Sequence, residues 1–314
     1  MPLPALIAIW IVAGLLILLI IGFVLISIKF SLMVLRPNTH DTEFLLNEAY
    51  EFKRFTPEYI ASLNKEEFTV RSEYGYDMHG IILRNENTEK EEYRKRVAVL
   101  CHGYTSGKIV MSGYAGILMD LGFTCVMYDH RNHGDNVKTV NTTMGYYERK
   151  DLVTVLDWVY EKFGKDARVI TYGESMGSAI VLSNLEIDDR PVLTIADCGY
   201  SDLTDLFRYL LKGVYHMPIW PILPIAGVIL KIWGHFDMKD VSPRKGVIKT
   251  KVPILFCHGD SDSFIPKEMS VEMSKLGDGV RQLYLCKGAD HAQSFSLEPE
   301  EYRKVVTEFI NKYY

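Results

Sequence analysis

A serine flanked by glycines is the strongest chemical signal in this chain. Residues 173–177 read Gly-Glu-Ser-Met-Gly, directly after the apolar run 169–172 and at the start of the helical pattern 176–185. A strand that turns tightly into a helix projects such a serine from the edge of a sheet, and the glycines let neighbouring elements pack closely. The helix N-terminus adds free N–H groups and partial positive charge. This context predicts Ser175 as a nucleophile rather than as part of an ordinary turn.

A second motif follows another apolar run. The sequence His-Gly-Tyr at 102–104 comes directly after residues 97–101. A loop at the C-terminal end of a buried strand can aim a backbone N–H at the serine. We predict that the N–H groups of Tyr104 and Met176 together bind the carbonyl oxygen as it becomes an anion. Taken alone, the motif also fits an ordinary glycine turn.

A general base and an acid are expected later in the chain. Of the nine histidines, His291 lies in a loop after the last apolar run, 282–285, which fits the order serine, acid, histidine. For the acid we predict Asp262, just past the run 253–257. Its neighbour Asp260 and the earlier Asp197 are rivals, because an acid from either strand can reach the histidine.

With these motifs, the chain from about residue 68 to 314 resembles the α/β-hydrolase superfamily. More closely, it resembles membrane-tethered bacterial serine hydrolases with a helical cap. The resemblance implies Ser175 as nucleophile, Asp262 as acid and His291 as base, but it does not fix a substrate. The matching segments are His-Gly-Tyr at 102–104, Asp-His-Arg-Asn-His-Gly at 129–134, Gly-Glu-Ser-Met-Gly at 173–177, His-Gly-Asp-Ser-Asp at 258–262 and Asp-His-Ala at 290–292.

The segment 129–134 raises the question of a metal site. It places His130 and His133 beside Asp129 and Asp135. Zinc sites need a convergent set of nitrogen and sulfur ligands at characteristic spacings, and no such set is complete here. In the family that the chain resembles, this loop supports the site without a metal. We therefore expect no metal and no cofactor.

The elements around these motifs indicate the fold class. Short apolar runs of the buried-strand kind alternate with helical patterns from residue 68 to the end of the chain. Such alternation predicts an α/β fold with a mostly parallel sheet covered by helices on both faces. The α/β-hydrolase fold with a helical cap, preceded by one N-terminal transmembrane helix, is the specific expectation.

The segment between residues 196 and 251 breaks the alternation. Residues 201–215 look helical, and 217–233 form an apolar stretch with Lys231 as its one charge. Three prolines at three-residue spacing argue against a continuous spanning helix. We predict a cap, about 198–248, that lines an apolar substrate pocket with Trp220 and Leu223. Contact of this cap with a membrane surface is left open.

The N-terminus is free of charge up to Ile28. A helix of 26 residues rises about 39 Å, enough to cross a hydrocarbon core of about 30 Å. A buried soluble helix rarely lacks polar positions over this length. A cleaved signal peptide needs a basic start and a small-residue cleavage site, and neither is present. We predict a retained anchor at 1–30, a connector at 31–66 and the hydrolase domain at 67–314.

Composition and charge limit the remaining possibilities. Hydrophobic residues make up 48% and charged residues 24%, which excludes a disordered chain and disfavours a protein with many spans. The net charge of −5 gives no field that attracts nucleic acid. Lys29 and Arg36 follow the apolar segment. We therefore predict a single-pass protein of the cell membrane, and the positive-inside tendency places its catalytic domain in the cytoplasm. The five cysteines lie in apolar runs and are expected to be reduced, which also favours the cytoplasm. The glycosylation sequon at Asn141 instead favours the outside of the cell.

The predicted activity is that of a serine hydrolase. We expect cleavage of carboxylic esters of apolar acyl groups through an acyl-enzyme, as in carboxylesterases and lipases. The Ile, Leu and Trp content of the cap motivates the apolar acyl group, so a small-molecule or lipid-like ester is the expected substrate. Two alternatives remain: a serine peptidase or amidase on the same fold, and a non-catalytic membrane-tethered interaction protein.

Overall fold

An eight-stranded sheet forms the centre of the computed structural model, which describes residues 2–136, 138 and 140–314. The strand order is β1-β2-β4-β3-β5-β6-β7-β8. Strand β2 runs antiparallel to β1 and β4, and the other neighbouring strands are parallel. The strands are β1 (Asn64–Arg71), β2 (Asp77–Arg84), β3 (Arg96–Cys101), β4 (Thr124–Tyr128), β5 (Arg168–Glu174), β6 (Leu193–Asp197), β7 (Ile254–Gly259) and β8 (Arg281–Cys286).

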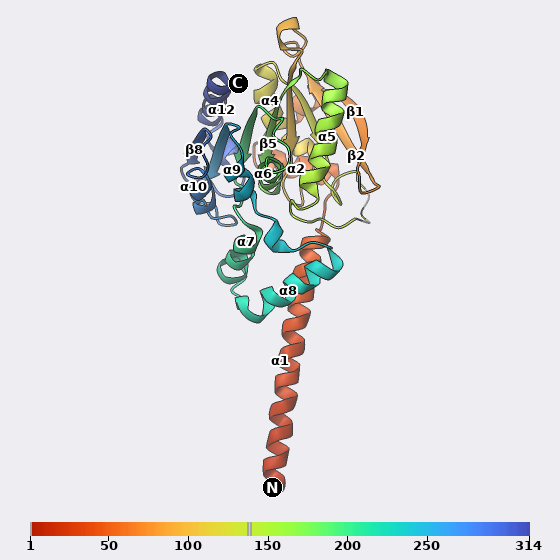
Figure 1. Cartoon of the computed structure of the whole chain (residues 1–314), viewed down its shortest axis with the longest axis vertical. Helices are drawn as coiled ribbons and strands as arrows, with labels where there is room; N and C mark the ends of the chain where they lie inside the picture. Colours follow the sequence, from red (N-terminus) through yellow and green to blue (C-terminus); the bar gives the residue numbers. More distant parts are fainter. Residues whose placement is uncertain (1, 137, 139) are drawn as a thin grey trace.

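Helices cover both faces of this sheet (Figure 1). Strands β4, β6 and β7 are buried along their whole length, as expected of short apolar runs between two helical layers. One core contains side chains of α5 (Glu148–Phe163), α6 (Met176–Asn184) and α10 (Glu268–Met273). The second core contains α4 (Ser112–Asp120) and α12 (Pro299–Tyr313). The predicted mostly parallel α/β fold is confirmed.

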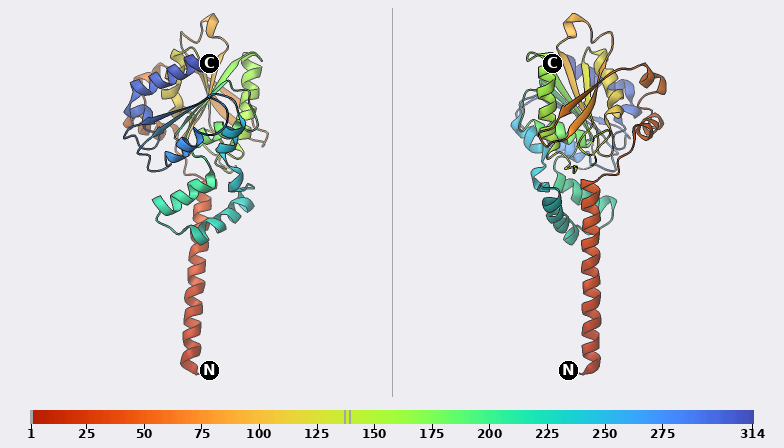
Figure 2. Two further views of the ribbon diagram at one scale, coloured as in Figure 1. Left: turned by 60° about the vertical axis from the view of Figure 1, so that its left-hand side comes forward. Right: turned by 90° about the vertical axis from the view of Figure 1, so that its right-hand side faces the viewer.

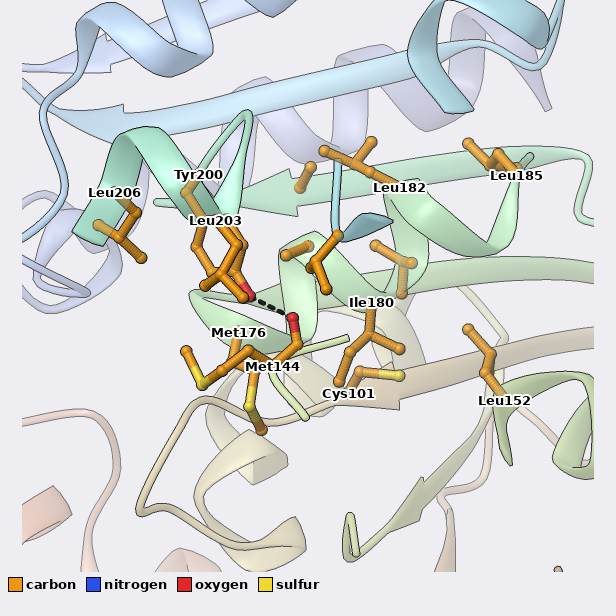
Figure 3. Close-up of a cluster of buried hydrophobic side chains, with 14 of the residues drawn as sticks. Cys101, Met144, Leu152, Met176, Ile180, Leu182, Leu185, Tyr200, Leu203 and Leu206 are labelled. Atoms are coloured by element: carbon orange, nitrogen blue, oxygen red, sulfur yellow. Dashed lines mark hydrogen bonds between the residues drawn. The ribbon is translucent and has the colours of Figure 1, made fainter. Parts of the chain in front are cut away.

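Side chains of the first core pack around α6, the helix that follows the predicted nucleophile (Figure 3). Met176 and Ile180 of α6 pack there among side chains that follow β6, including Tyr200 and Leu203. The hydroxyl of Tyr200 donates a hydrogen bond of 2.5 Å to the carbonyl of Met144. The start of α6 is therefore held by apolar packing and has little freedom to shift.

A helical cap separates β6 from β7. It comprises α7 (Leu203–Tyr209), a π-helical turn at Leu210–Val214, α8 (Ile219–Trp233) and a 3₁₀ turn at Met238–Asp240, and α9 (Pro243–Lys249) leads back to the sheet. The sequence predicted that the prolines prevent a continuous spanning helix, and α8 has only 15 residues with a break at its start. Trp220 is non-helical, so Pro221 and Pro224 fall within the first turn, whose N–H groups have no intrahelical acceptor.

The N-terminal helix α1 (Leu3–Leu35) has 33 residues and extends away from the domain (Figures 1 and 2). It continues five residues past the predicted anchor boundary at residue 30. Among the described residues, none before Ser27 is buried, and the buried side chains near the C-terminal end include Phe30, Val34 and Leu35. These last turns belong to the first core. The helix is apolar and long enough to cross a membrane.

The segment between α1 and the sheet packs on the domain. Asp41 caps α2 (Thr42–Glu51), and Thr56 caps α3 (Pro57–Ser62), each by accepting a hydrogen bond from a backbone N–H. Leu45 of α2 is buried in the second core. The predicted connector is thus structured, and α2 helps to wall the site described next.

Candidate active site

Ser175 occupies the tight turn between β5 and α6. Its backbone φ is +55° and its ψ is −115°, a conformation that non-glycine residues rarely adopt. Space around the turn is minimal: a Cβ on Gly177 would lie 2.0 Å from the carbonyl oxygen of Cys101. A Cβ on Gly173 would lie 2.2 Å from the carbonyl oxygen of Gly177. The glycines are therefore required by close packing, as the motif predicts.

Ser175, His291 and Asp262 form one hydrogen-bonded chain. Nε2 of His291 lies 2.9 Å from Oγ of Ser175, and Nδ1 lies 2.8 Å from Oδ2 of Asp262. In the tautomer that fits both contacts, the Nδ1–H donates to the carboxylate and the serine hydroxyl donates to Nε2. The structure brings these three predicted residues together. The arrangement can transfer the serine proton to the imidazole while the carboxylate orients the ring.

Asp262 is held as a carboxylate. Burial would raise its pKa, but hydrogen bonds from His258 and His291 outweigh burial and hold the pKa well below its usual range. Its Oδ1 also accepts from the N–H groups of Phe264 and Ile265, at 2.9 and 2.8 Å. Nε2 of His258 lies 3.2 Å from Oδ2 of Asp262. His258 is a positioning residue that sequence reasoning treated as structural.

The two rival acids are engaged elsewhere. Asp260 is half-buried, and its carboxylate accepts hydrogen bonds from the Gly288 N–H and the Ser261 hydroxyl. Asp197 is fully buried and accepts from the Tyr302 hydroxyl at 2.7 Å, and burial raises its pKa to about 7. Of the three candidate acids, Asp262 is the one bonded to His291.

The predicted oxyanion donors lie on two elements beside the serine. Met176 begins α6, and Tyr104 follows β3, which pairs with β5 next to the turn. Among the described residues, neither the Met176 N–H nor the Tyr104 N–H donates to an acceptor. Free N–H groups beside a nucleophile suit the binding of a developing oxyanion. Their assignment remains a prediction.

Neutral histidines support the loop that carries Tyr104. Nε2 of His133 accepts from the Thr105 N–H at 3.1 Å, and Nε2 of His102 accepts from the His130 N–H at 2.9 Å. Burial lowers the pKa of His102 to about 4 and that of His133 to about 3. In the part of the chain that the structure describes, no group of three or more His, Cys, Asp or Glu side chains is placed to hold a metal ion.

A polar cavity of about 200 Å³ adjoins Ser175 and His291. Its lining includes Glu48 of α2, Thr105 and Glu174. Sequence reasoning did not identify it, because α2 was assigned to a connector without a role in the site.

An apolar slot of about 60 Å³ reaches Ser175 from another direction. The slot is lined in part by the cap residues Phe207 and Leu210. Its other wall includes Phe30, Met33 and Val34, which belong to the C-terminal turns of α1. Sequence reasoning missed this contribution, since an evenly apolar helix gives no signal for which residues face a site.

The two predicted substrate-binding residues of the cap lie outside both cavities. Trp220 is 77% exposed, and Leu223 is buried in the first core. Neither side chain lines the polar cavity or the apolar slot. A substrate-binding role for them stays a prediction without support from these cavities. The cap does line the slot, but through α7 and the turn that follows it.

A buried ion pair ties the segment after α2 to the site. Arg54 donates to Oε2 of Glu174 at 2.6 Å and to the carbonyl of Ala292 at 3.0 Å. Glu174 also accepts from the Tyr114 hydroxyl at 2.6 Å. Glu174 precedes Ser175, and Ala292 follows the base. One guanidinium therefore holds both the nucleophile turn and the histidine loop.

Comparisons with known proteins place the chain in a hydrolase family. A sequence model of the hydrolase family described as serine aminopeptidase, S33, matches residues 92–195. The chain is 30% identical over 295 residues to the uncharacterized protein YqkD of Bacillus subtilis (strain 168), a match that covers 93% of this chain and 94% of YqkD.

Two solved structures show similar folds. The esterase Pf2001 of Pyrococcus furiosus is 20% identical, with a TM-score of 0.64 over 82% of this chain and 96% of the esterase. Est1E of Butyrivibrio proteoclasticus, solved with ferulic acid bound, is 18% identical, with a TM-score of 0.62 over 78% of this chain and 98% of Est1E. At these identities the likeness concerns the fold.

Proposed function

Because this chain belongs to the α/β-hydrolase superfamily, we propose that it is a serine hydrolase that cleaves carboxylic esters of apolar acyl groups. The observation that carries the proposal is the hydrogen-bonded chain from Asp262 through His291 to Ser175, with contacts of 2.8 and 2.9 Å. A non-catalytic interaction protein has no need of this arrangement or of a strained serine backbone.

The mechanism follows from the atoms in contact. His291 Nε2 accepts the proton of the Ser175 hydroxyl as Oγ attacks the acyl carbonyl, and Asp262 stabilises the imidazolium. The N–H groups of Tyr104 and Met176 bind the oxyanion of the tetrahedral intermediate. The imidazolium then protonates the departing alkoxide, which leaves an ester between the acyl group and Ser175. Water, activated by His291, hydrolyses this acyl-enzyme and regenerates the serine.

The two cavities suggest how an ester binds. The apolar slot of about 60 Å³ suits the acyl group, and the polar cavity of about 200 Å³ suits the alcohol. The slot has less than half the volume of an apolar cavity of about 150 Å³, which is enough to hold one benzene molecule. As it stands, it accommodates only a short acyl chain, and longer chains require the cap to move. We therefore expect short-chain esters to be preferred.

A chain-length series tests this activity. The full chain is assayed in detergent micelles with p-nitrophenyl acetate, butyrate, octanoate and palmitate. We expect kcat/KM to be highest for the short esters, and Ser175→Ala to lower the rate by several orders of magnitude. Turnover that survives Ser175→Ala, or no turnover of any ester, would contradict the proposal.

A peptidase is the second candidate, because the matched family is described as serine aminopeptidase. Recognition of a peptide amine needs an available carboxylate near the serine. Two carboxylates line the polar cavity, but Glu174 is already paired with Arg54 and Tyr114. The other, Glu48, is exposed, and an ion pair between an exposed carboxylate and an amine contributes little binding energy in water. We therefore favour esters. Cleavage of aminoacyl-p-nitroanilides with higher kcat/KM than the matched esters would reverse this preference.

We also propose that α1 is a retained membrane anchor and that the catalytic domain lies in the cytoplasm. Removal of α1 by a signal peptidase would also remove Phe30 and Leu35, which are buried in the domain, and would uncover the core side chains that they cover. The five cysteines are free and buried, which suits a reducing compartment. The side-chain nitrogen of Asn141 donates to the carbonyl of Trp233 at 2.7 Å, which disfavours glycosylation there.

Topology is tested in intact cells. A cysteine placed at the exposed Glu89 is treated with a maleimide that does not cross membranes. Protection in intact cells with labelling after lysis is expected for a cytoplasmic domain. Labelling from outside would show the opposite orientation.

A further inference from the structure

The outward face of α8 is apolar although it is exposed. Val228 and Ile232, one helical turn apart, are 59% and 60% exposed. Trp220, which lies just before the first helical turn, is 77% exposed. Trp233 ends the helix at 45% exposure. The only charged side chain of α8 is Lys231. We define these four apolar side chains, Trp220, Val228, Ile232 and Trp233, as the cap tip. An exposed apolar face of this kind normally marks a contact surface.

The inner face of α8 is already occupied, which excludes α8 as a membrane span. Ile222, Ala226 and Leu230 are buried completely in the first core. The carbonyl of Ile222 accepts from the Ser27 hydroxyl at 3.2 Å, and that of Ala226 accepts from the Ser31 hydroxyl at 3.4 Å. These contacts fix α8 directly against α1.

The position of α8 along α1 indicates what covers the cap tip. The unburied part of α1 from Leu3 to Gly22 has 20 residues and a length of about 30 Å, the thickness of a hydrocarbon core. Ser27, the first residue of α1 that is hydrogen-bonded to α8, lies five residues further on, or about 8 Å. The headgroup region begins at the edge of the core and extends over a similar distance. Helix α8 therefore meets α1 at the level of the headgroups.

The figures agree with this placement. In the views of Figures 1 and 2, the cap elements α7 and α8 are the parts of the domain nearest to the free end of α1. Tryptophans at both ends of α8 are typical of helices at a membrane–water boundary, where the ring is partly wet. Lys231 has a long apolar stem that can remain in the interface while its ammonium group reaches the headgroups.

We propose that the cap tip is an interfacial membrane-binding surface and that its partner is the bilayer crossed by α1. The helix lies along the surface with its outward face among headgroups and upper acyl segments, and it does not span. The apolar slot, whose wall is formed by α1 and the cap, is then held close to the bilayer surface. This inference rests on the proposed anchor and is independent of the reaction that Ser175 performs.

The test measures the environment of single side chains in the full chain. Val228→Cys is labelled with the fluorophore NBD, since the five native cysteines are buried. Labelled protein is reconstituted into vesicles of phosphatidylethanolamine and phosphatidylglycerol, with or without lipids that carry a doxyl quencher near the headgroup. Ile248→Cys on α9 is the matched control, because Ile248 is an exposed aliphatic side chain, at 54%, outside the cap tip.

We expect the dye at residue 228 to shift its emission to the blue and to be quenched several-fold more than the dye at residue 248. Emission and quenching equal to those at residue 248 would overturn the proposal. Flotation after an alkaline wash separates the two possible failures. Protein that does not float with the vesicles contradicts the anchor itself, whereas floating protein with a water-exposed dye at residue 228 contradicts only the docking of the cap.

Discussion

The hydroxyl of Tyr104 donates a hydrogen bond to the backbone carbonyl of Met33. Tyr104 belongs to the loop whose N–H we assign to the oxyanion hole, and Met33 belongs to the last turns of α1. The Tyr104 side chain also lines both cavities at Ser175. Helix α1 and the loop predicted to bind the oxyanion are therefore joined by a direct contact, and we expect a displacement of one to shift the other.

Tyr104→Phe tests this contact. The substitution keeps the ring and the backbone N–H but removes the hydroxyl that holds the loop to α1. A hydrogen bond of this kind contributes about 1 kcal/mol, so we expect kcat to fall roughly fivefold with little change in KM. Steady-state kinetics with p-nitrophenyl butyrate measure the effects on kcat and on KM separately. An unchanged kcat would show that the bond does not position the loop, and a change in KM alone would point to substrate contact instead.

Met33→Ala tests whether α1 forms part of the acyl site. Met33 lines the slot and is 44% exposed, so the substitution enlarges the slot without opening the core. We expect the ratio of kcat/KM for octanoate to that for butyrate to rise about tenfold, since methylene groups in an apolar pocket are worth about 1–3 kcal/mol.

Leu32→Ala is the matched control for this change. Leu32 is 42% exposed and lies next to Met33, but it does not line the slot. The octanoate-to-butyrate ratio should stay at the wild-type value in this variant. Equal ratios in the two variants would argue against a slot wall made by α1.

Arg54→Met tests the ion pair behind the site. Removal of the guanidinium leaves the buried carboxylate of Glu174 without its cation, which typically costs 3–5 kcal/mol. We expect the thermal midpoint in detergent to fall by roughly 10 °C. Adding Glu174→Gln to Arg54→Met should recover part of this loss. The control is Arg71→Met, which breaks an exposed pair with Asp77 and should change the midpoint very little.

The arrangement of Ser175, Asp262 and His291 was largely predictable from the sequence. Ser175, Asp262 and His291 each follow an apolar run, and the C-terminal ends of parallel strands meet at one edge of a sheet. The role of α1 was not predictable, because an evenly apolar segment carries no periodicity that singles out Phe30 or Met33. Trp220 was predicted to line a pocket because it is a large apolar residue. It is exposed because the opposite face of α8 packs on α1, which the sequence does not reveal.

The buried histidines give a prediction for pH. Lowered folded-state pKa values near 4 for His102 and near 3 for His133 mean that both rings stay neutral when the protein is folded. Their contribution to stability is complete above pH 6.5 and is lost as the pH falls, by about 2 kcal/mol for each ring at pH 5. Asp151 and Asp197 have raised pKa values, about 6 and 7, and act in the opposite direction over this range.

NMR spectra of the histidine ring ¹⁵N atoms report the protonation state of each ring directly. The opposing effect of the aspartates on stability does not enter this measurement. We expect the signals of His102 and His133 to remain those of neutral Nδ1–H tautomers at pH 5. Substitution of each histidine by Gln assigns its signal. Titration of either ring with a midpoint near 6.5 would contradict the neutral, acceptor role that the structure gives its Nε2.

Fluorophosphonate labelling of the full chain in its membrane tests the central claim most directly, because the reagent reacts with an activated serine and not with an ordinary one. The predicted result is one modified peptide that contains Ser175, with labelling abolished in Ser175→Ala and slowed by orders of magnitude in His291→Ala. Ser178→Ala, which alters a buried serine one turn along α6, should label like the wild type. Absence of label on Ser175 in folded protein, or equal labelling of Ser175→Ala, would contradict the account.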